Sequence, residues 1–125
     1  MKPVALLAVL IVLACGCGGS GGHLYSLQKT KACLRKDGVR LGGPLDFVAT
    51  TATGGAVQAH LPTNFVTLVF GDTLDKADNL NQAYHRFHAE NVGIDDVLRQ
   101  DRNAVMLWHA HPSDASLARI TACLK

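Results

Sequence analysis

The chain has 125 residues, with 12 lysines and arginines against 10 aspartates and glutamates, and a formal net charge of +2 at pH 7. This near balance argues against nucleic acid as a partner, because binding to phosphate backbones needs a strongly basic surface. About 100 residues remain after the N-terminal region described next, which is the usual size of one domain with one hydrophobic core.

The first residues have the profile of a secretion signal. Met1, Lys2 and Pro3 give a short positive start, and residues 4–14 are an uninterrupted run of valine, alanine, leucine and isoleucine. A helix of this length, at about 1.5 Å per residue, would span roughly half of a hydrocarbon core about 30 Å thick, which argues against a permanent transmembrane helix. We therefore predict that residues 1–14 are a signal peptide and that the protein is exported.

Val12, Leu13 and Ala14 directly precede Cys15. This short segment resembles the lipobox of bacterial lipoproteins, in which the cysteine is lipidated and the signal peptidase cuts before it. The resemblance implies cleavage between Ala14 and Cys15, a lipid on Cys15, and an anchor at the extracytoplasmic face of the cell membrane. A lipidated cysteine of this type carries more than one acyl chain, which is sufficient for stable anchoring. An ordinary secreted protein is the alternative.

Glycine dominates the segment after Cys15, which also contains Cys17 and Ser20. Such a sequence has almost no side chains to pack, so residues 15–23 are predicted to be a flexible tether. Residues 24–125 then form a single small domain.

The folded part contains two cysteines, Cys33 and Cys123, each one residue before a leucine and each expected on a helix. In an exported protein, two such cysteines suggest a disulfide. Closing a loop of about 90 residues would stabilise the fold by on the order of 4 to 5 kcal/mol in the chain-entropy model. We therefore predict a Cys33–Cys123 bridge between the first and last helices, and two buried thiols are the alternative.

The secondary structure is predicted from hydrophobic periodicity and from turn and capping residues. In chain order we expect a helix at 25–36, strands at 46–51, 56–61 and 65–70, a helix at 74–91, strands at 96–99 and 104–108, and a final helix after 113. Thr73 and Ser113 are expected to cap their helices. Because tight turns join the strands, we expect an α+β fold with a largely antiparallel sheet of about five strands and helices packed on one face.

Histidines are the strongest candidates for chemistry. His85 and His88 are three residues apart on the expected helix, and His109 and His111 would leave the last strand on one side. Together these four imidazoles could bind zinc or copper. Exposed surface histidines are the alternative interpretation, since nothing in the sequence brings the strand end to that helix.

Other catalytic patterns are weaker. Ser113 follows His109 and His111, but it has no Gly-x-Ser-x-Gly motif around it and suits a helix cap. The leading hypothesis is a membrane-tethered domain of the cell envelope that is not an enzyme, needs no cofactor and binds an envelope protein or a small ligand. A histidine-based zinc or copper protein is the first alternative, and a small hydrolase is the second.

Overall fold

The structure is a computed structural model that describes residues 23–88 and 93–125. The predicted signal peptide at 1–14, Cys15 and most of the predicted tether lie outside the described residues. Within those two ranges, five helices and a five-stranded sheet form an α+β fold. The predicted class is therefore confirmed.

Every strand pair in the sheet is antiparallel, and the strand order is β1-β2-β3-β5-β4. The strands are β1 (Arg40–Leu41), β2 (Ala56–His60), β3 (Phe65–Phe70), β4 (Leu98–Asp101) and β5 (Ala104–Trp108). The central pair, β3 and β5, places Val66 opposite Trp108 and Phe70 opposite Ala104. The sheet therefore joins a strand from the first half of the domain to one from the second half.

The helices are α1 (Leu27–Lys36), α2 (Phe47–Thr50), α3 (Leu74–Phe87), α4 (Ile94–Val97) and α5 (Asp114–Thr121). Four of them begin with a side chain that accepts a hydrogen bond from a backbone N–H three residues later, and the capping residues are Ser26, Asp46, Thr73 and Ser113. Such caps satisfy N–H groups that have no partner inside the helix. The predicted caps at Thr73 and Ser113 are confirmed.

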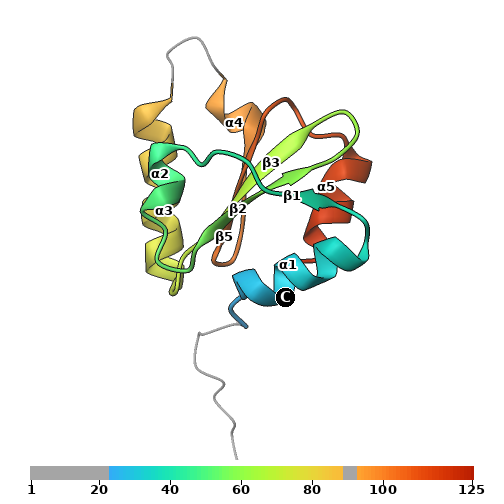
Figure 1. The fold of residues 1–125 in the computed structure, drawn as a ribbon. Coiled ribbons are helices and arrows are strands. Elements are labelled where there is room, and N and C mark those ends of the chain that lie inside the picture. Colours follow the sequence, from blue (N-terminus) through green and yellow to red (C-terminus); the bar gives the residue numbers. More distant parts are fainter. Residues whose placement is uncertain (1–22, 89–92) are drawn as a thin grey trace, which may run out of the picture.

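Helices cover both faces of the sheet, not one face as expected. In Figure 1 the sheet lies between α2 and α3 on one side and α1 and α5 on the other. All residues from Val66 to Phe70 of β3 are buried. Because successive side chains of a strand point to opposite faces, such a continuous buried run requires a cover on each face.

The segment predicted as a strand at 46–51 is wrong, since it contains α2. The Asp46 carboxylate accepts a hydrogen bond from the Ala49 N–H at 2.8 Å, and the hydroxyls of Thr50 and Thr51 donate to carbonyls three residues earlier. These local bonds outweigh the strand propensity of valine and threonine. The first strand is instead β1 at the sheet edge.

Two other boundaries differ. The predicted strand at 96–99 begins only at Leu98, because α4 (Ile94–Val97) precedes it. The helix expected at 74–91 extends to Phe87, and residues 89–91 lie outside the described residues.

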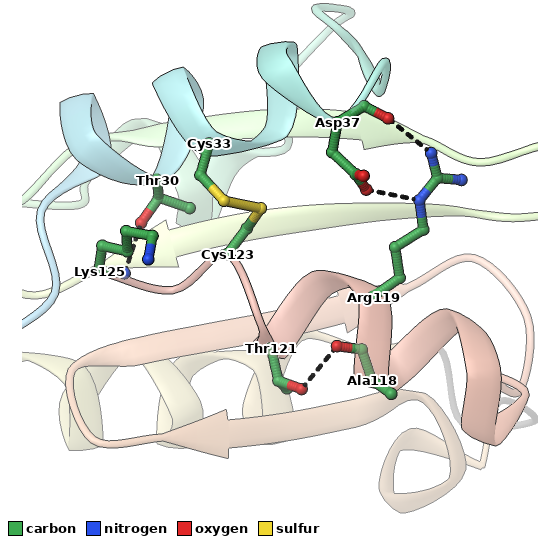
Figure 2. The surroundings of a disulfide bond; sticks show 8 residues. All are labelled: Thr30, Cys33, Asp37, Ala118, Arg119, Thr121, Cys123 and Lys125. Atoms are coloured by element: carbon green, nitrogen blue, oxygen red, sulfur yellow. Dashed lines mark hydrogen bonds and ion pairs between the residues drawn. A yellow bond between two sulfur atoms is a disulfide. The ribbon is translucent and has the colours of Figure 1, made fainter.

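The predicted disulfide between Cys33 and Cys123 is present, with 5.4 Å between the Cα atoms (Figure 2). Nearby, Arg119 donates hydrogen bonds to the carboxylate and the backbone carbonyl of Asp37, at 2.8 and 2.9 Å. These contacts fasten α1 to the C-terminal segment. A disulfide of this kind fits a protein located outside the cytoplasm. Among the described residues, no helix has the length and apolar character needed to cross a membrane.

Candidate functional site

A cavity of about 570 Å³ lies on the α2 and α3 side of the sheet. It is lined by α2, the C-terminal end of α3, α4 and the strands β2, β3 and β5. Its walls are mostly apolar, with the aromatic residues Phe47, Phe65, Tyr84, Phe87 and Trp108 and the aliphatic residues Pro44, Val48, Ile94, Val97 and Leu107. This volume and this lining are typical of sites for small molecules.

Two phenylalanines form the rim of the cavity. The side chains of Phe47 and Phe87 are 74% and 67% exposed, although both line the cavity. Their ring centroids are 6.3 Å apart and their planes are nearly perpendicular, at 81°. Aromatic rings attract one another in this edge-to-face arrangement. Exposed apolar side chains gathered at a cavity indicate a binding surface, whereas single exposed ones carry no such meaning.

Asp46 and Tyr84 form the main polar pair of the cavity. The Tyr84 hydroxyl lies 3.1 and 3.0 Å from the two carboxylate oxygens of Asp46 and donates its hydrogen bond to them. Burial of Tyr84 and then the negative charge of Asp46 raise the pKa of the phenol well above its usual value. The phenol therefore stays protonated and acts as a donor.

Gln58 and Thr67 add neutral polar groups to the cavity wall. Both residues are buried, at 8% and 5% exposure, and they face each other across β2 and β3. The Gln58 amide makes one long contact, 3.4 Å, to the carbonyl of Pro44. Amide and hydroxyl groups both donate and accept hydrogen bonds, so this wall can orient a ligand that has a polar atom.

The structure separates the four histidines proposed as metal ligands. His88 and His109 line the cavity, and His109 stacks on Phe65 with 4.5 Å between ring centroids. His85 and His111 instead contact two different carboxylates on α4. In residues 23–88 and 93–125, no three side chains of histidine, cysteine, aspartate or glutamate are placed to hold a metal ion. The four imidazoles therefore do not converge on one zinc or copper ion as hypothesised.

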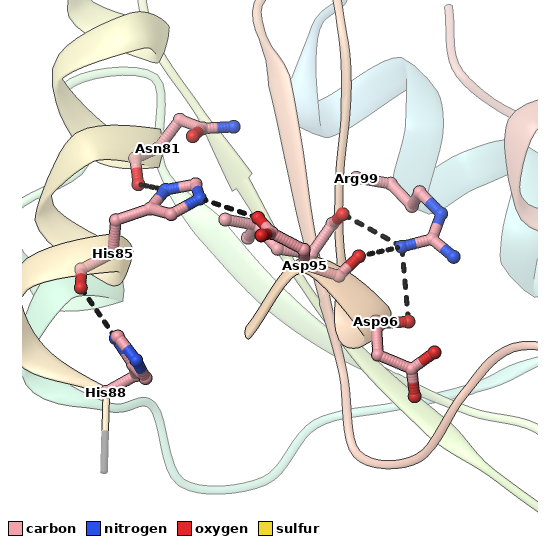
Figure 3. A network of polar contacts seen from close by, with 7 residues as sticks. Asn81, His85, His88, Asp95, Asp96 and Arg99 are labelled. Atoms are coloured by element: carbon pink, nitrogen blue, oxygen red, sulfur yellow. Dashed lines mark hydrogen bonds and ion pairs between the residues drawn. The ribbon is translucent and has the colours of Figure 1, made fainter. Parts of the chain in front are cut away.

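The two histidine–carboxylate contacts hold α4 from both sides. His85 on α3 lies 3.0 Å from Asp95, and His111 after β5 lies 2.6 Å from Asp96. Figure 3 shows His85 reaching from α3 toward Asp95, and Arg99 donating to backbone carbonyls of Asp95 and Asp96. Since Ile94 and Val97 of α4 line the cavity, these contacts fix one of its walls.

Ser113 serves as a helix cap. Its hydroxyl oxygen accepts a hydrogen bond from the Ser116 N–H at 3.1 Å, and the hydroxyl donates to Ser116 Oγ at 3.0 Å. Among the described residues Ser113 makes no hydrogen bond to a histidine, so the arrangement is that of a cap and not of an activated nucleophile.

Sequence reasoning missed the residues that make this cavity polar and accessible. The sequence predicts a strand at 46–51 and a helix at 74–91, and Asp46 and Tyr84 are 38 residues apart. The local signal for Asp46 is its position just before a short helix, where aspartate is a favoured cap. No signal in the sequence predicts that Phe47 and Phe87 are exposed side by side.

Comparison with known proteins gives no relative: no protein-family model, no curated protein sequence and no solved structure matches this chain.

Proposed function

We propose that this protein is a lipid-anchored binding module of the cell envelope that holds a small, largely apolar ligand in the cavity between α2, α3, α4 and the sheet. The observation that carries this proposal is the cavity of about 570 Å³ with two exposed aromatic residues, Phe47 and Phe87, at its rim. A ligand that covers these two side chains would remove their apolar surface from water. This is favourable by roughly 25 cal/mol for each Å² that is buried.

The polar groups of the cavity favour binding over catalysis. Asp46 is held by the Tyr84 hydroxyl and the Ala49 N–H, and Tyr84 is kept protonated by its surroundings. A phenol that stays protonated is neither a nucleophile nor a general base, so the Asp46–Tyr84 pair is suited to holding a ligand. We therefore assign these groups to recognition of the ligand.

Two features of the chain support this location. The segment before Cys15 resembles a lipobox, and the disulfide between Cys33 and Cys123 fits an oxidising compartment. A lipid on Cys15 would hold the domain at the extracytoplasmic face of the cell membrane.

The anchor is tested by fractionation of cells that express Cys15→Ser, with Cys17→Ser as the control. We expect the wild-type protein and the Cys17 variant in the membrane fraction, and the Cys15 variant in the soluble fraction. Incorporation of labelled palmitate should be lost only in the Cys15 variant. A Cys15 variant that still fractionates with membranes would contradict lipidation at this residue.

Ligand binding is tested with a neutral apolar fluorophore such as N-phenyl-1-naphthylamine. Phe47→Ala combined with Phe87→Ala should weaken binding by roughly tenfold, since two large apolar contacts are lost. Leu74→Ala removes another exposed apolar side chain that does not line the cavity, and should leave binding unchanged. Equal loss in both variants would contradict binding in the cavity.

A further inference from the structure

The cavity contains one negatively charged side chain and no permanently positive one among its described lining residues. Among the described lining residues, Asp46 alone carries a formal charge when the histidines are neutral, and none is a lysine or arginine. In the described part of the chain, the ion pairs involve Asp95, Asp96 and Asp37, so Asp46 has no cationic partner within 4.0 Å. A negative charge therefore faces the cavity without a countercharge from residues 23–88 and 93–125.

The hydrogen bonds to Asp46 orient its charge but do not cancel it. Its donors are the Tyr84 hydroxyl at 3.0 Å and the Ala49 N–H at 2.8 Å, and both are neutral groups. Because Asp46 is only partly buried, its charge is partly screened by water and can still attract a cation that enters the cavity. A cationic ligand would therefore form an ion pair with Asp46 that the described side chains do not form.

The aromatic residues next to this carboxylate also favour a cation. Phe47 follows Asp46 in the chain, and its ring stands nearly perpendicular to that of Phe87 at the rim. The faces of aromatic rings carry negative potential and attract ammonium groups. The Phe87 ring already attracts one cation of the chain, since the Arg86 guanidinium lies 5.9 Å from its centroid. Arg86 does not line the cavity, so it leaves the interior without a positive charge.

We propose that the cavity selects amphiphilic amines, with the ammonium group seated between Asp46 and the rim phenylalanines and the apolar part packed against the β3 and β5 side. This inference rests on the proposed function, since it names the class of ligand for the same cavity. Neutral molecules of the same shape would bind more weakly, and carboxylic acids would be repelled by Asp46.

The test uses three probes with eight carbons each, octylammonium, octanol and octanoate, whose head groups are positive, neutral and negative. The mature chain carries Cys15→Ser, so that no acyl chain of its own competes for the cavity. It is titrated at pH 8, which is above the ordinary titration range of histidine. We expect octylammonium to bind roughly tenfold more tightly than octanol, with octanoate the weakest, as expected for one partly screened charge contact. The preference should shrink in high salt.

Asp46→Asn separates the charge from the structure, because asparagine is an equally good helix cap and keeps the α2 start. In this variant octylammonium and octanol should bind equally. Asp75→Asn makes the same change in net charge at an exposed position of α3 and should keep the tenfold preference.

The outcomes distinguish the two proposals. If octanol binds and octylammonium binds no better, or if the preference persists in the Asp46 variant, the amine selectivity is wrong while the binding function stands. If none of the three probes binds to the wild-type protein, both the selectivity and the proposed function are wrong.

Discussion

His85 bridges two hydrogen-bond acceptors on different elements: its Nδ1 lies 2.9 Å from the Asn81 carbonyl oxygen and its Nε2 lies 3.0 Å from Asp95 Oδ1. A neutral imidazole has one N–H and can donate only one of these bonds, whereas the imidazolium donates both. The bond to the Asn81 carbonyl and then the Asp95 carboxylate accordingly raise the pKa of His85 above its usual value.

This raised pKa predicts a pH-dependent stability. A group whose pKa is higher in the folded state contributes stability that is fully present below its unfolded pKa, about 6.5, and is lost as the pH rises through the folded value. His85 and Asp95 are 44% and 90% exposed, so solvent screening limits the contribution to a few tenths of a kcal/mol. Urea unfolding at pH 5.5 and 8.5 should show a smaller pH difference for His85→Gln than for the wild type.

His23→Gln, at the start of the described residues, replaces a histidine outside the Asp95 contact and serves as the control. Identical pH differences in the wild type and the His85 variant would show that the Asp95 contact adds nothing to stability.

The Cys33–Cys123 disulfide should contribute a large share of the stability of this small domain. It closes a loop across a sequence separation of 90 residues, and removal of such a bridge commonly costs about 2 to 5 kcal/mol. Thermal unfolding of the double variant Cys33→Ala and Cys123→Ala should therefore occur at a clearly lower temperature. A reductant should lower the wild-type midpoint in the same way and leave the double variant unchanged. Equal midpoints for the oxidised wild type and the variant would contradict this role.

The local sequence predicted those parts of the fold that depend on neighbouring residues. The cap at Thr73, the strand Phe65–Phe70 and the turns between strands follow from short patterns. The disulfide was predictable because few cysteines offer few pairings. The helix α2 was not, because its valine and threonine residues have strand propensity, and only the side-chain bonds of Asp46, Thr50 and Thr51 turn the segment into a helix.

Local sequence patterns do not predict the cavity, because it forms only when segments far apart in the chain pack together. Tyr84 meets Asp46 only when α3 packs beside α2, and the same packing brings Phe87 to Phe47. Tyr84 is a buried residue of α3, where a tyrosine usually completes a core. The spacing of the four histidines suggests a metal site, whereas in the structure His85 and His111 contact the carboxylates of α4.

The hydrogen bond from the Tyr84 hydroxyl to Asp46 should contribute measurably to the stability of the fold. Tyr84→Phe removes one donor from the carboxylate and should lower the free energy of unfolding by about 1 kcal/mol. Because the pKa of the phenol is raised in the folded state, its contribution is present below the unfolded pKa, about 10, and stability falls as the pH rises above it. Tyrosinate absorbance of the folded wild type should show one of its two tyrosines ionising only upon unfolding. Ionisation of both tyrosines in the folded protein near pH 10 would contradict this.

Asn103 should be among the least replaceable polar residues of the domain. It is 1% exposed; its side-chain oxygen accepts from the Tyr25 N–H at 2.7 Å, and its amide donates to the carbonyls of Tyr25 and Gly71 at 2.9 and 2.8 Å. Asn103→Ala leaves buried backbone groups without partners and should cost about 2 to 4 kcal/mol.

Asn103→Asp keeps the shape but directs a buried carboxylate at two carbonyl oxygens, so its cost should be at least as large as that of the alanine variant. Urea unfolding measures both losses, and hydrogen exchange of the Tyr25 amide should accelerate because its acceptor is lost in the alanine variant. The exposed Asn79→Ala is the matched control and should change the free energy of unfolding by less than about 0.5 kcal/mol. If Asn103→Asp were as stable as the wild type, the amide of Asn103 would not hold the start of α1 to the connection after β3.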